Sequence, residues 1–299
     1  MAIPHTALET KAILARLGLK PERRLGQNFL VDERTRDRVI TAAGIRPDET
    51  ILEIGPGLGA LTEALARHAR RVVAIEKDGR LVDFLTGEFA GTARVMIVNG
   101  DIRRVDLAKL VSEEERNAAR EARGAKPRTD GWSVVASPPY YLVAFLVRKL
   151  LDLAYPPRHI TLVVQKEVAD RLAAGAGEMN LLALAAQLAS RVAKHDRISR
   201  RAFWPQPDVD STIVTLASHA PDKRPIPAAQ EEEFFNLVRP LFQTRRKQLA
   251  GSLGRTLKLT PPQTIKLLTM AHIPPEARPQ EISVDKWVRL FRILEAHRI

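Results

Sequence analysis

Short apolar runs alternate with helical patterns through the first half of the chain. The apolar runs at residues 50–54, 71–75, 95–98, 133–136 and 160–164 are predicted as strands, and the stretches 60–68, 80–88 and 144–153 have helical spacing. Short apolar strands separated by helices are typical of a parallel sheet that helices cover on both faces. We therefore predict an α/β fold with a doubly wound, Rossmann-like sheet.

The pattern changes after residue 164. Helical stretches at 166–174 and 181–189 are followed by a strand-like run at 212–216 and then by a segment rich in proline and polar residues at 219–228. The remainder, 230–299, is helical in character and basic, and it gives no strand signal. We predict two domains, an α/β domain at 1–220 and a small helical, basic domain at 221–299.

A charge-dense segment lies between the third and fourth predicted strands, at residues 106–131. It contains the run Glu113-Glu114-Glu115-Arg116 and ends near Gly124 and Pro127. Consecutive charges of this kind favour a solvated surface. We predict a solvated helix followed by a loop.

The charge balance of the 299 residues favours a polyanionic partner. Lys and Arg number 47 against 35 Asp and Glu, which gives a net charge of +12. Such an excess is typical of proteins that bind nucleic acid or an anionic membrane surface. The absence of cysteine excludes disulfides, thiolate metal sites and thiol nucleophiles. The sequence has no signal-peptide pattern at 1–12 and no apolar run of membrane-spanning length. We therefore expect a cytoplasmic protein that is monomeric, holds no metal and has no membrane partner.

Three glycines follow the first predicted strand of the sheet, at Gly55, Gly57 and Gly59. Glycine allows a tight turn and lets backbone N–H groups approach a ligand closely. The spacing differs from that of the dinucleotide fingerprint, and no Walker lysine follows, which disfavours a triphosphate site. A plain turn between strand and helix explains the loop alone equally well.

Two acidic residues end the next two predicted strands. Glu76 follows the run at 71–75, and Asp101 follows the run at 95–98. At the carboxyl end of a strand, Glu76 could accept both ribose hydroxyls of a nucleoside, and Asp101 could accept an adenine amino group. Each acid alone is more often a solvated residue or a helix cap. Together, after a glycine loop, they predict a nucleoside site at this edge of the sheet.

The tetrapeptide Ser137-Pro138-Pro139-Tyr140 closes the fourth predicted strand. Two prolines hold the backbone rigid and leave carbonyl oxygens without a competing N–H, and an aromatic ring after them can stack on a base. The Ser137 hydroxyl and the Pro138 carbonyl are candidate acceptors for the hydrogens of an exocyclic amine. This polarises its nitrogen for attack on an electrophilic methyl group. A Pro-Pro turn with a packed tyrosine is the alternative.

Basic residues gather in two stretches. The first includes Arg200 and Arg201, and the second includes Arg245, Arg246 and Lys247. Such clusters fit phosphate contacts on structured RNA, although a solvated helix face has the same composition. Next to a cleft that modifies bases, we predict RNA binding.

These motifs together resemble the ribosomal RNA adenine dimethyltransferase family, whose bacterial members modify two adjacent adenines of small-subunit RNA. The resemblance runs from about Lys20 to Arg255. It rests on Glu76, Asp101 and the segments 25–32 (which contains Gln27-Asn28-Phe29-Leu30), 53–59, 165–169, 203–211 and 242–247.

The resemblance implies S-adenosylmethionine as the methyl donor and small-subunit ribosomal RNA, or the small subunit itself, as the partner. By motif match, Glu76 would bind the ribose of the donor and Asp101 its adenine. The other residues that would contact the donor are Asn28, Leu30, Gly55, Gly57 and Ile102. Phe203 would stack on the flipped target base, opposite Tyr140. The implied reaction is N6-methylation of adenine.

The chain departs from the family where Ser137-Pro138 replaces the usual Asn-Leu, in the length of 106–131, and at 175–180. Ser-Pro-Pro-Tyr resembles the motif of amino-directed DNA methylases, so amine methylation is still expected. Two other functions remain open. One is a ribosome-assembly factor that binds RNA with little or no methylation, and the other is a methylase of another nucleic-acid target.

Overall fold

The computed structural model describes residues 3–21, 27–121 and 131–297, apart from the side chains of 115–121 and Tyr140. Contacts divide the chain into two compact units, one of Met1–Ala169 and Ala193–Ser218 and the other of Asp170–Val192 and His219–Ile299. The strands are β1 (Phe29–Leu30), β2 (Thr50–Ile54), β3 (Arg71–Glu76), β4 (Val95–Asn99), β5 (Trp132–Ala136), β6 (His159–Gln165), β7 (Ser190–Ile198), β8 (Phe203–Trp204) and β9 (Ser211–Ser218).

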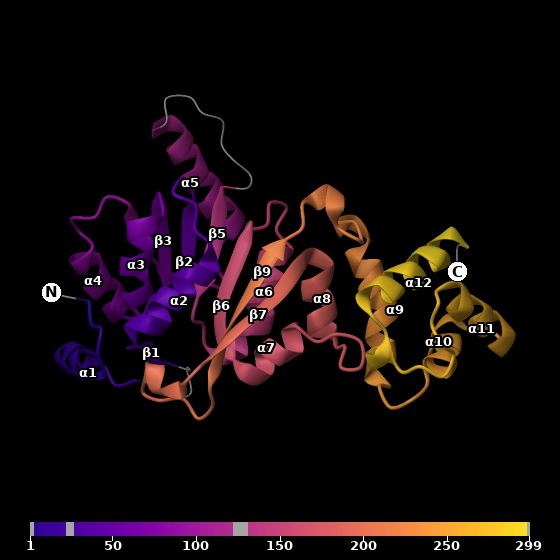
Figure 1. Ribbon diagram of the computed structural model, residues 1–299. Coiled ribbons are helices and arrows are strands. Elements are labelled where there is room, and N and C mark those ends of the chain that lie inside the picture. Colours follow the sequence, from indigo (N-terminus) through magenta and orange to yellow (C-terminus); the bar gives the residue numbers. More distant parts are fainter. Residues whose placement is uncertain (1–2, 22–26, 122–130, 298–299) are drawn as a thin grey trace. The chain divides into compact units, whose positions relative to one another are not determined.

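Seven of these strands form one sheet in the order β4-β3-β2-β5-β6-β9-β7 (Figure 1). Neighbouring strands from β4 to β6 pair in parallel, and β9 pairs antiparallel with β6. Every residue of β2 and β5 is buried, because these central strands have helices on both faces. The register aligns Ile54 at the end of β2 with Ile75 in β3 and with Ala136 at the end of β5.

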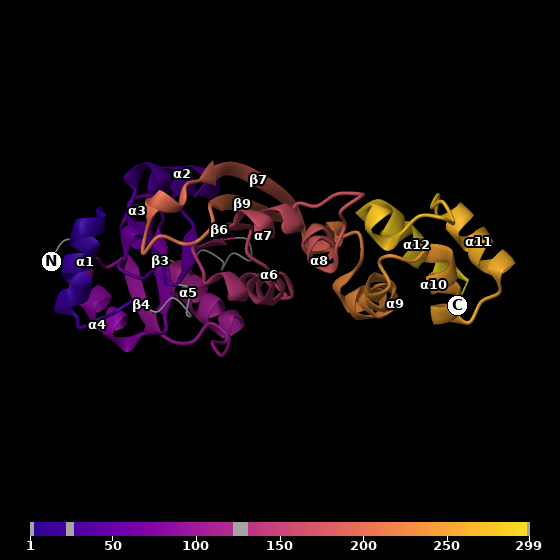
Figure 2. The same ribbon diagram turned by 90° about the horizontal axis from the view of Figure 1, so that it is seen from below.

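Helices cover both faces of this sheet. In the first unit they are α1 (Ala7–Arg16), α2 (Glu33–Ala43), α3 (Ala60–His68), α4 (Gly79–Glu88), α5 (Leu107–Glu121) and α6 (Val143–Leu151), with short 3-10 helices η2 (Tyr140–Leu142) and η3 (Arg200–Ala202). Figure 2 shows α2 on one face of the sheet, with α5 and α6 on the other. One apolar core joins α2 and α3 to the sheet through Val39, Leu65 and Val72. The predicted doubly wound α/β fold is confirmed.

The second unit is helical. It contains α8 (Leu181–Ala189), α9 (Glu231–Gln243), α10 (Leu249–Leu257), α11 (Pro261–Met270) and α12 (Val284–Ala296), with η4 (Pro221–Lys223), η5 (Ala228–Gln230) and η6 (Pro279–Glu281), while α7 (Lys166–Leu172) and β7 cross the unit boundaries in sequence. Its core is built around Phe234, Leu268 and Trp287, and Phe234 meets Phe291 edge to face at 5.5 Å between ring centres. Amphipathic helices bury these faces against one another because none could bury its own.

The helical unit contains one segment that the predicted domain boundary near residue 220 assigns to the α/β domain. The second boundary, after Ser218, lies close to the predicted one, but residues 170–192 also group with the helical unit. Ala183, Leu184 and Leu188 of α8 lie in the same core as Phe234. The apolar spacing of α8 predicts a buried helix, and spacing alone does not say which core covers it.

The charged segment 106–131 contains the predicted helix, as α5, whereas the predicted loop at 122–130 lies outside the described residues. The helix is not solvated all round. Glu114 is buried and forms an ion pair with Arg71 at the start of β3. Of the helices in the described part of the chain, none is long and apolar enough to cross a membrane.

Candidate active site

A cavity of about 280 Å³ opens where the parallel strands β2, β3 and β4 end. Carboxyl ends of parallel strands meet at one edge of a sheet, which is the usual ligand position in doubly wound folds. The sequence-predicted residues that line this cavity are Asn28, Gly55, Gly57, Glu76, Asp101, Ile102 and Ser137. Segments that are far apart in sequence are thus brought together as the strand-end argument requires.

The glycine loop forms the turn between β2 and α3. Gly55 and Gly57 have φ angles of 74° and 59°, in the left-handed region where a side chain is strained. A Cβ atom on Gly55 would meet nothing within 4 Å, so the backbone there is open to a ligand in the cavity. A Cβ atom on Gly57 would lie only 3.2 Å from the Phe29 ring.

The sequence analysis predicted that backbone N–H groups of this loop approach a ligand. In the structure, the N–H groups of Gly55 and Gly57 already donate hydrogen bonds within the protein. The N–H of Gly55 donates to the Ile75 carbonyl at 3.0 Å, and the N–H of Gly57 donates to Glu76 Oε2 at 3.2 Å. Neighbouring strand ends offer acceptors that satisfy these donors within the protein. The loop therefore contributes shape and close approach, and the acids contribute the polar contacts.

Glu76 is held in place by backbone N–H groups. It ends β3, is 9 % exposed, and Oε1 accepts the N–H groups of Lys77 and Asp78 at 2.7 and 3.0 Å. Burial raises the pKa of the Glu76 carboxyl above its usual range, and the backbone N–H groups that donate to it oppose this. The carboxylate is therefore fixed in place at the cavity wall before any ligand arrives.

Asp101 follows β4 and is engaged by two cations. Arg103 donates through Nε to Oδ1 at 3.0 Å, and Lys77 Nζ lies 3.3 Å from Oδ2. The hydrogen bond from the Arg103 side chain holds the pKa of Asp101 well below its usual range. Asp101 is thus an ionised acceptor in the cavity, and a base amine that binds it would share the carboxylate with Arg103.

The Ser137-Pro138-Pro139-Tyr140 turn lies at the end of β5, beside the strand that carries the glycine loop. Ser137 and Pro139 line the cavity together with Tyr141 and Leu142. Pro138 is buried, and the Pro139 carbonyl accepts the N–H of Leu142, which closes η2. The side chain of Tyr140 lies outside the described part of the structure.

Phe203 and Leu30 do not line the cavity. They face each other in the antiparallel pair of β8 with β1, and Phe203 is 3 % exposed within the core that contains Val39 and Ile198. The neighbouring pair of Phe29 with Trp204 adjoins α1, where Lys11 Nζ lies 5.5 Å from the centre of the Trp204 ring. The stacking of Phe203 on a target base stays a prediction.

Several cavity residues were missed by the sequence analysis. They are Gln27, Phe29, Lys77, Asp78, Leu81, Arg103, Tyr141 and Leu142. Lys77 and Asp78 could have been found, because they follow Glu76 directly at the end of β3. Arg103 and Tyr141 lie one or two residues past a predicted site residue, where a sequence does not indicate the direction of the side chain.

Glu53 lies near the end of the buried strand β2, two residues before Gly55. Its Oε2 accepts the Thr62 hydroxyl at 2.6 Å, and its Oε1 is buried with no hydrogen-bond partner among the described residues. Burial raises the pKa of Glu53 to about 8. The apolar run around it gave no signal that an acid here is kept neutral.

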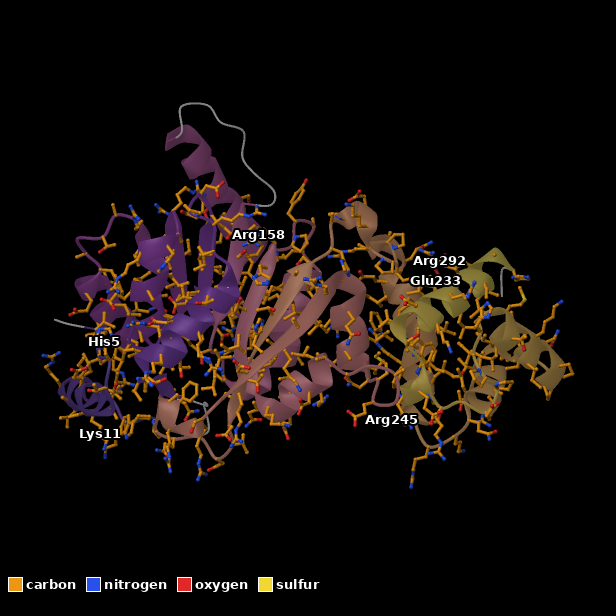
Figure 3. The ribbon with its side chains drawn as sticks, in the orientation of Figure 1. His5, Lys11, Arg158, Glu233, Arg245 and Arg292 are labelled. Carbon is orange, nitrogen blue, oxygen red and sulfur yellow. The ribbon has the colours of Figure 1, made fainter. Side chains whose placement is uncertain are left out.

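The predicted RNA-binding residues lie on exposed surface. Arg200 and Arg201 form η3 in the first unit, where the Arg200 N–H donates to Asp210 at 2.8 Å. Arg245, Arg246 and Lys247 occupy the turn after α9 in the second unit, and Figure 3 labels Arg245 there. Among the residues that the structure describes, no cluster of His, Asp and Glu could hold a metal ion.

Comparison with known proteins places these features in context. The model of the ribosomal RNA adenine dimethylases matches residues 18–296. A ribosomal RNA small subunit methyltransferase A from Geobacillus thermodenitrificans is 36 % identical over 290 residues, covering 95 % of this chain and 94 % of that protein. The protein of the same name from Dehalococcoides mccartyi (strain CBDB1) is 31 % identical over 287 residues, covering 96 % and 93 %.

Solved structures resemble the chain over nearly its whole length. The 23S rRNA methyltransferase ErmE superposes with a TM-score of 0.71 at 27 % identity, covering 90 % of this chain and all 100 % of that one. A dimethyladenosine transferase from Plasmodium falciparum gives a TM-score of 0.72 at 23 % identity, covering 91 % and 98 %, and shares the fold.

Proposed function

Because the chain belongs to the ribosomal RNA adenine dimethylase family, we propose that its cavity holds S-adenosylmethionine beside an adenine of small-subunit ribosomal RNA and methylates N6 of that base. As a member of this family the protein is a methyltransferase, and S-adenosylmethionine-dependent dimethylation of ribosomal RNA adenines is its activity. The observation that carries the assignment of the site is the convergence of Gly55, Glu76, Asp101 and Ser137 on one cavity.

The residues present fit the methyl donor. Gly55 leaves its part of the wall without a side chain, and Glu76 offers a fixed acceptor to the two ribose hydroxyls. Asp101 stays ionised and can accept the amino group of the donor's adenine, and Ile102 supplies an apolar contact for that ring. Asn28 also lines the cavity. Leu30 does not line it, and would help to position Asn28 through the pairing of β1 with β8.

Ser137 and Pro138 are the groups that would polarise the target. When bound, the donor supplies an electrophilic methyl group. The Ser137 hydroxyl oxygen and the Pro138 carbonyl accept the two hydrogens of the adenine amine, which concentrates electron density on its nitrogen. The amine nitrogen, so held, would take up this methyl group and then release one proton to solvent. Holding the amine in line is the principal contribution of the protein to the rate.

The exposed basic residues would hold the RNA. Arg200 and Arg201 lie next to β8 in the unit that carries the cavity, and Arg245, Arg246 and Lys247 present a second basic surface on the helical unit. Phosphate contacts from such residues position an RNA without reading its sequence.

The protein would act as a cytoplasmic monomer on the small ribosomal subunit or its RNA. The substrate itself is found where ribosomes are assembled, which supports the cytoplasmic location.

Methyl transfer to under-methylated ribosomal subunits tests this function. Purified protein and S-adenosylmethionine would be incubated separately with small and large subunits, and the RNA would be digested and analysed by mass spectrometry. We expect N6-methylated and N6,N6-dimethylated adenine in the small-subunit RNA only. Product on the large subunit or on cytosine would replace the proposed target, and RNA binding without any product would identify an assembly factor.

A further inference from the structure

An exposed tyrosine stands at the mouth of the cavity. Tyr141 belongs to η2, directly after the Ser-Pro-Pro turn, and lines the cavity although it is 59 % exposed. Glu76, by contrast, is buried at the inner wall. Tyr141 therefore faces solvent at the rim and remains accessible to a macromolecule that docks over the opening.

A second aromatic ring and a lysine continue this surface along α6. Phe145 lies four residues after Tyr141 and is 39 % exposed, and Lys149 lies four residues further, with Nζ 5.8 Å from the centre of the Phe145 ring. Residues four apart in a helical segment share one side of it. Phe145 and Lys149 thus lie on one side of α6, and Tyr141 precedes that helix at the cavity; we call these three residues the α6 ridge.

The α6 ridge is fixed to the loop that follows Asp101. Lys149 Nζ donates to the carbonyls of Ile102 and Val105 at 2.7 and 2.8 Å. Arg103 from this loop lines the same cavity as Tyr141. Aromatic rings with cations beside them are what sequence-tolerant binding of unpaired nucleotides uses, because every base has a face that can stack.

We propose that Tyr141 stacks on a nucleobase next to the target adenine, so that the α6 ridge holds the RNA strand beside the cavity while the target base enters it. This inference rests on the proposed function, since it takes RNA as the substrate. The bases of an RNA double helix are stacked on one another and cannot stack on a tyrosine. The ligand is therefore a single-stranded RNA segment. Tyr141 is then a substrate-positioning residue that acts on RNA binding, whereas the methyl donor is held by the inner wall.

Two variants and a matched control test the role of Tyr141. Tyr141→Ala removes the ring, Tyr141→Phe keeps it without the hydroxyl, and Tyr155→Ala removes a tyrosine that is 64 % exposed in the segment between α6 and β6. The first readout is KM and kcat for under-methylated small subunits, with the affinity for S-adenosylmethionine measured separately by calorimetry. The second is the fluorescence of a short single-stranded RNA with adjacent adenines, flanked by 2-aminopurine, which stacking quenches.

Tyr141→Ala should raise KM for the subunit about 5- to 150-fold, the range for loss of one stacked base, and should abolish the quenching. Tyr141→Phe and Tyr155→Ala should behave as the wild type, and donor affinity should stay unchanged in all three. An unchanged KM and unchanged quenching in Tyr141→Ala would overturn the proposal. So would a loss confined to donor affinity, which would place the ring against S-adenosylmethionine.

Failure of the proposed function would look different. The wild type would then leave ribosomal adenines unmethylated, and the binding of the fluorescent RNA, which needs no methyl transfer, would still decide whether Tyr141 stacks on a base.

Discussion

Replacement of Glu76 by alanine should weaken the binding of S-adenosylmethionine. Glu76 is held at the cavity wall by the N–H groups of Gly57, Lys77 and Asp78, so it needs no reorganisation to accept the ribose hydroxyls. Hydrogen bonds to a charged group contribute about 1.5–3 kcal/mol. At about 1.4 kcal/mol for each factor of ten, the dissociation constant should rise about 10- to 150-fold.

Calorimetric titration would measure this affinity, with Glu113→Ala as the control because Glu113 is an exposed acid on α5 of the same unit. Thermal unfolding without donor would separate lost stability from lost binding, since Glu76→Ala also leaves three backbone N–H groups without their acceptor. Equal affinity in Glu76→Ala and the wild type would remove Glu76 from the donor site.

The pH dependence of donor binding gives a second readout on the same residue. Burial raises the pKa of Glu76, so this carboxyl takes up its proton at a higher pH than an ordinary glutamate does. A protonated carboxyl accepts fewer hydrogen bonds. Affinity should therefore be full above this pKa and fall as pH falls through it, and Glu76→Gln should remove that part of the pH dependence. A pH profile identical in Glu76→Gln and the wild type would refute the reasoning.

Three further predictions follow from other parts of the structure. Burial raises the pKa of Glu53 from about 4.5 to about 8, so the folded state binds the extra proton and stability should fall by up to about 1.4 kcal/mol per pH unit across that window. Urea unfolding of Glu53→Gln should lack this slope, and a slope equal to that of the wild type would contradict the assignment. Arg158, labelled in Figure 3, pairs with the buried Glu49 at 2.9 Å. Arg158→Met should lower the free energy of unfolding by about 3–5 kcal/mol, because Glu49 would stay buried without its cation, whereas a change below about 1 kcal/mol would show that the pair is not needed. Replacing Arg245, Arg246 and Lys247 together by alanine should weaken RNA binding and flatten the slope of log affinity against log salt, and an unchanged slope would place the RNA contacts elsewhere.

The cavity wall made by β2, β3 and β4 could be predicted because its signals are local. Each strand is a short apolar run. Gly55 follows the first run, Glu76 ends the second, and Asp101 comes shortly after the third. Parallel strands bring these ends to one edge of the sheet. The polar strand β7 gave no such signal. Most of its residues are exposed, so it lacks both a continuous apolar run and a clear alternation, and its basic residues indicated an RNA-binding surface rather than a strand.

Long-range packing explains what else the sequence did not reveal. The position of α8 in the helical core depends on Phe234, Trp287 and other residues that lie far from it in the chain. The engagement of Asp101 by Arg103, and of Glu114 by Arg71, depends on side-chain directions that composition and spacing do not fix. Phe203 was assigned by motif match, and its burial in the β1–β8 region follows from a pairing that has no sequence signature.

The central claim is that the Ser137-Pro138 turn polarises an adenine amine for methylation. Single-turnover methyl transfer to under-methylated small subunits tests this claim most directly. Ser137→Ala removes one acceptor of the amine and leaves the donor wall of Gly55 and Glu76 intact. We expect the rate of the chemical step to fall in Ser137→Ala, with the affinities for S-adenosylmethionine and RNA nearly unchanged, and Ser137→Asn to keep or raise the rate. A Ser137→Ala variant that forms N6-methyladenine and N6,N6-dimethyladenine as fast as the wild type would contradict the account.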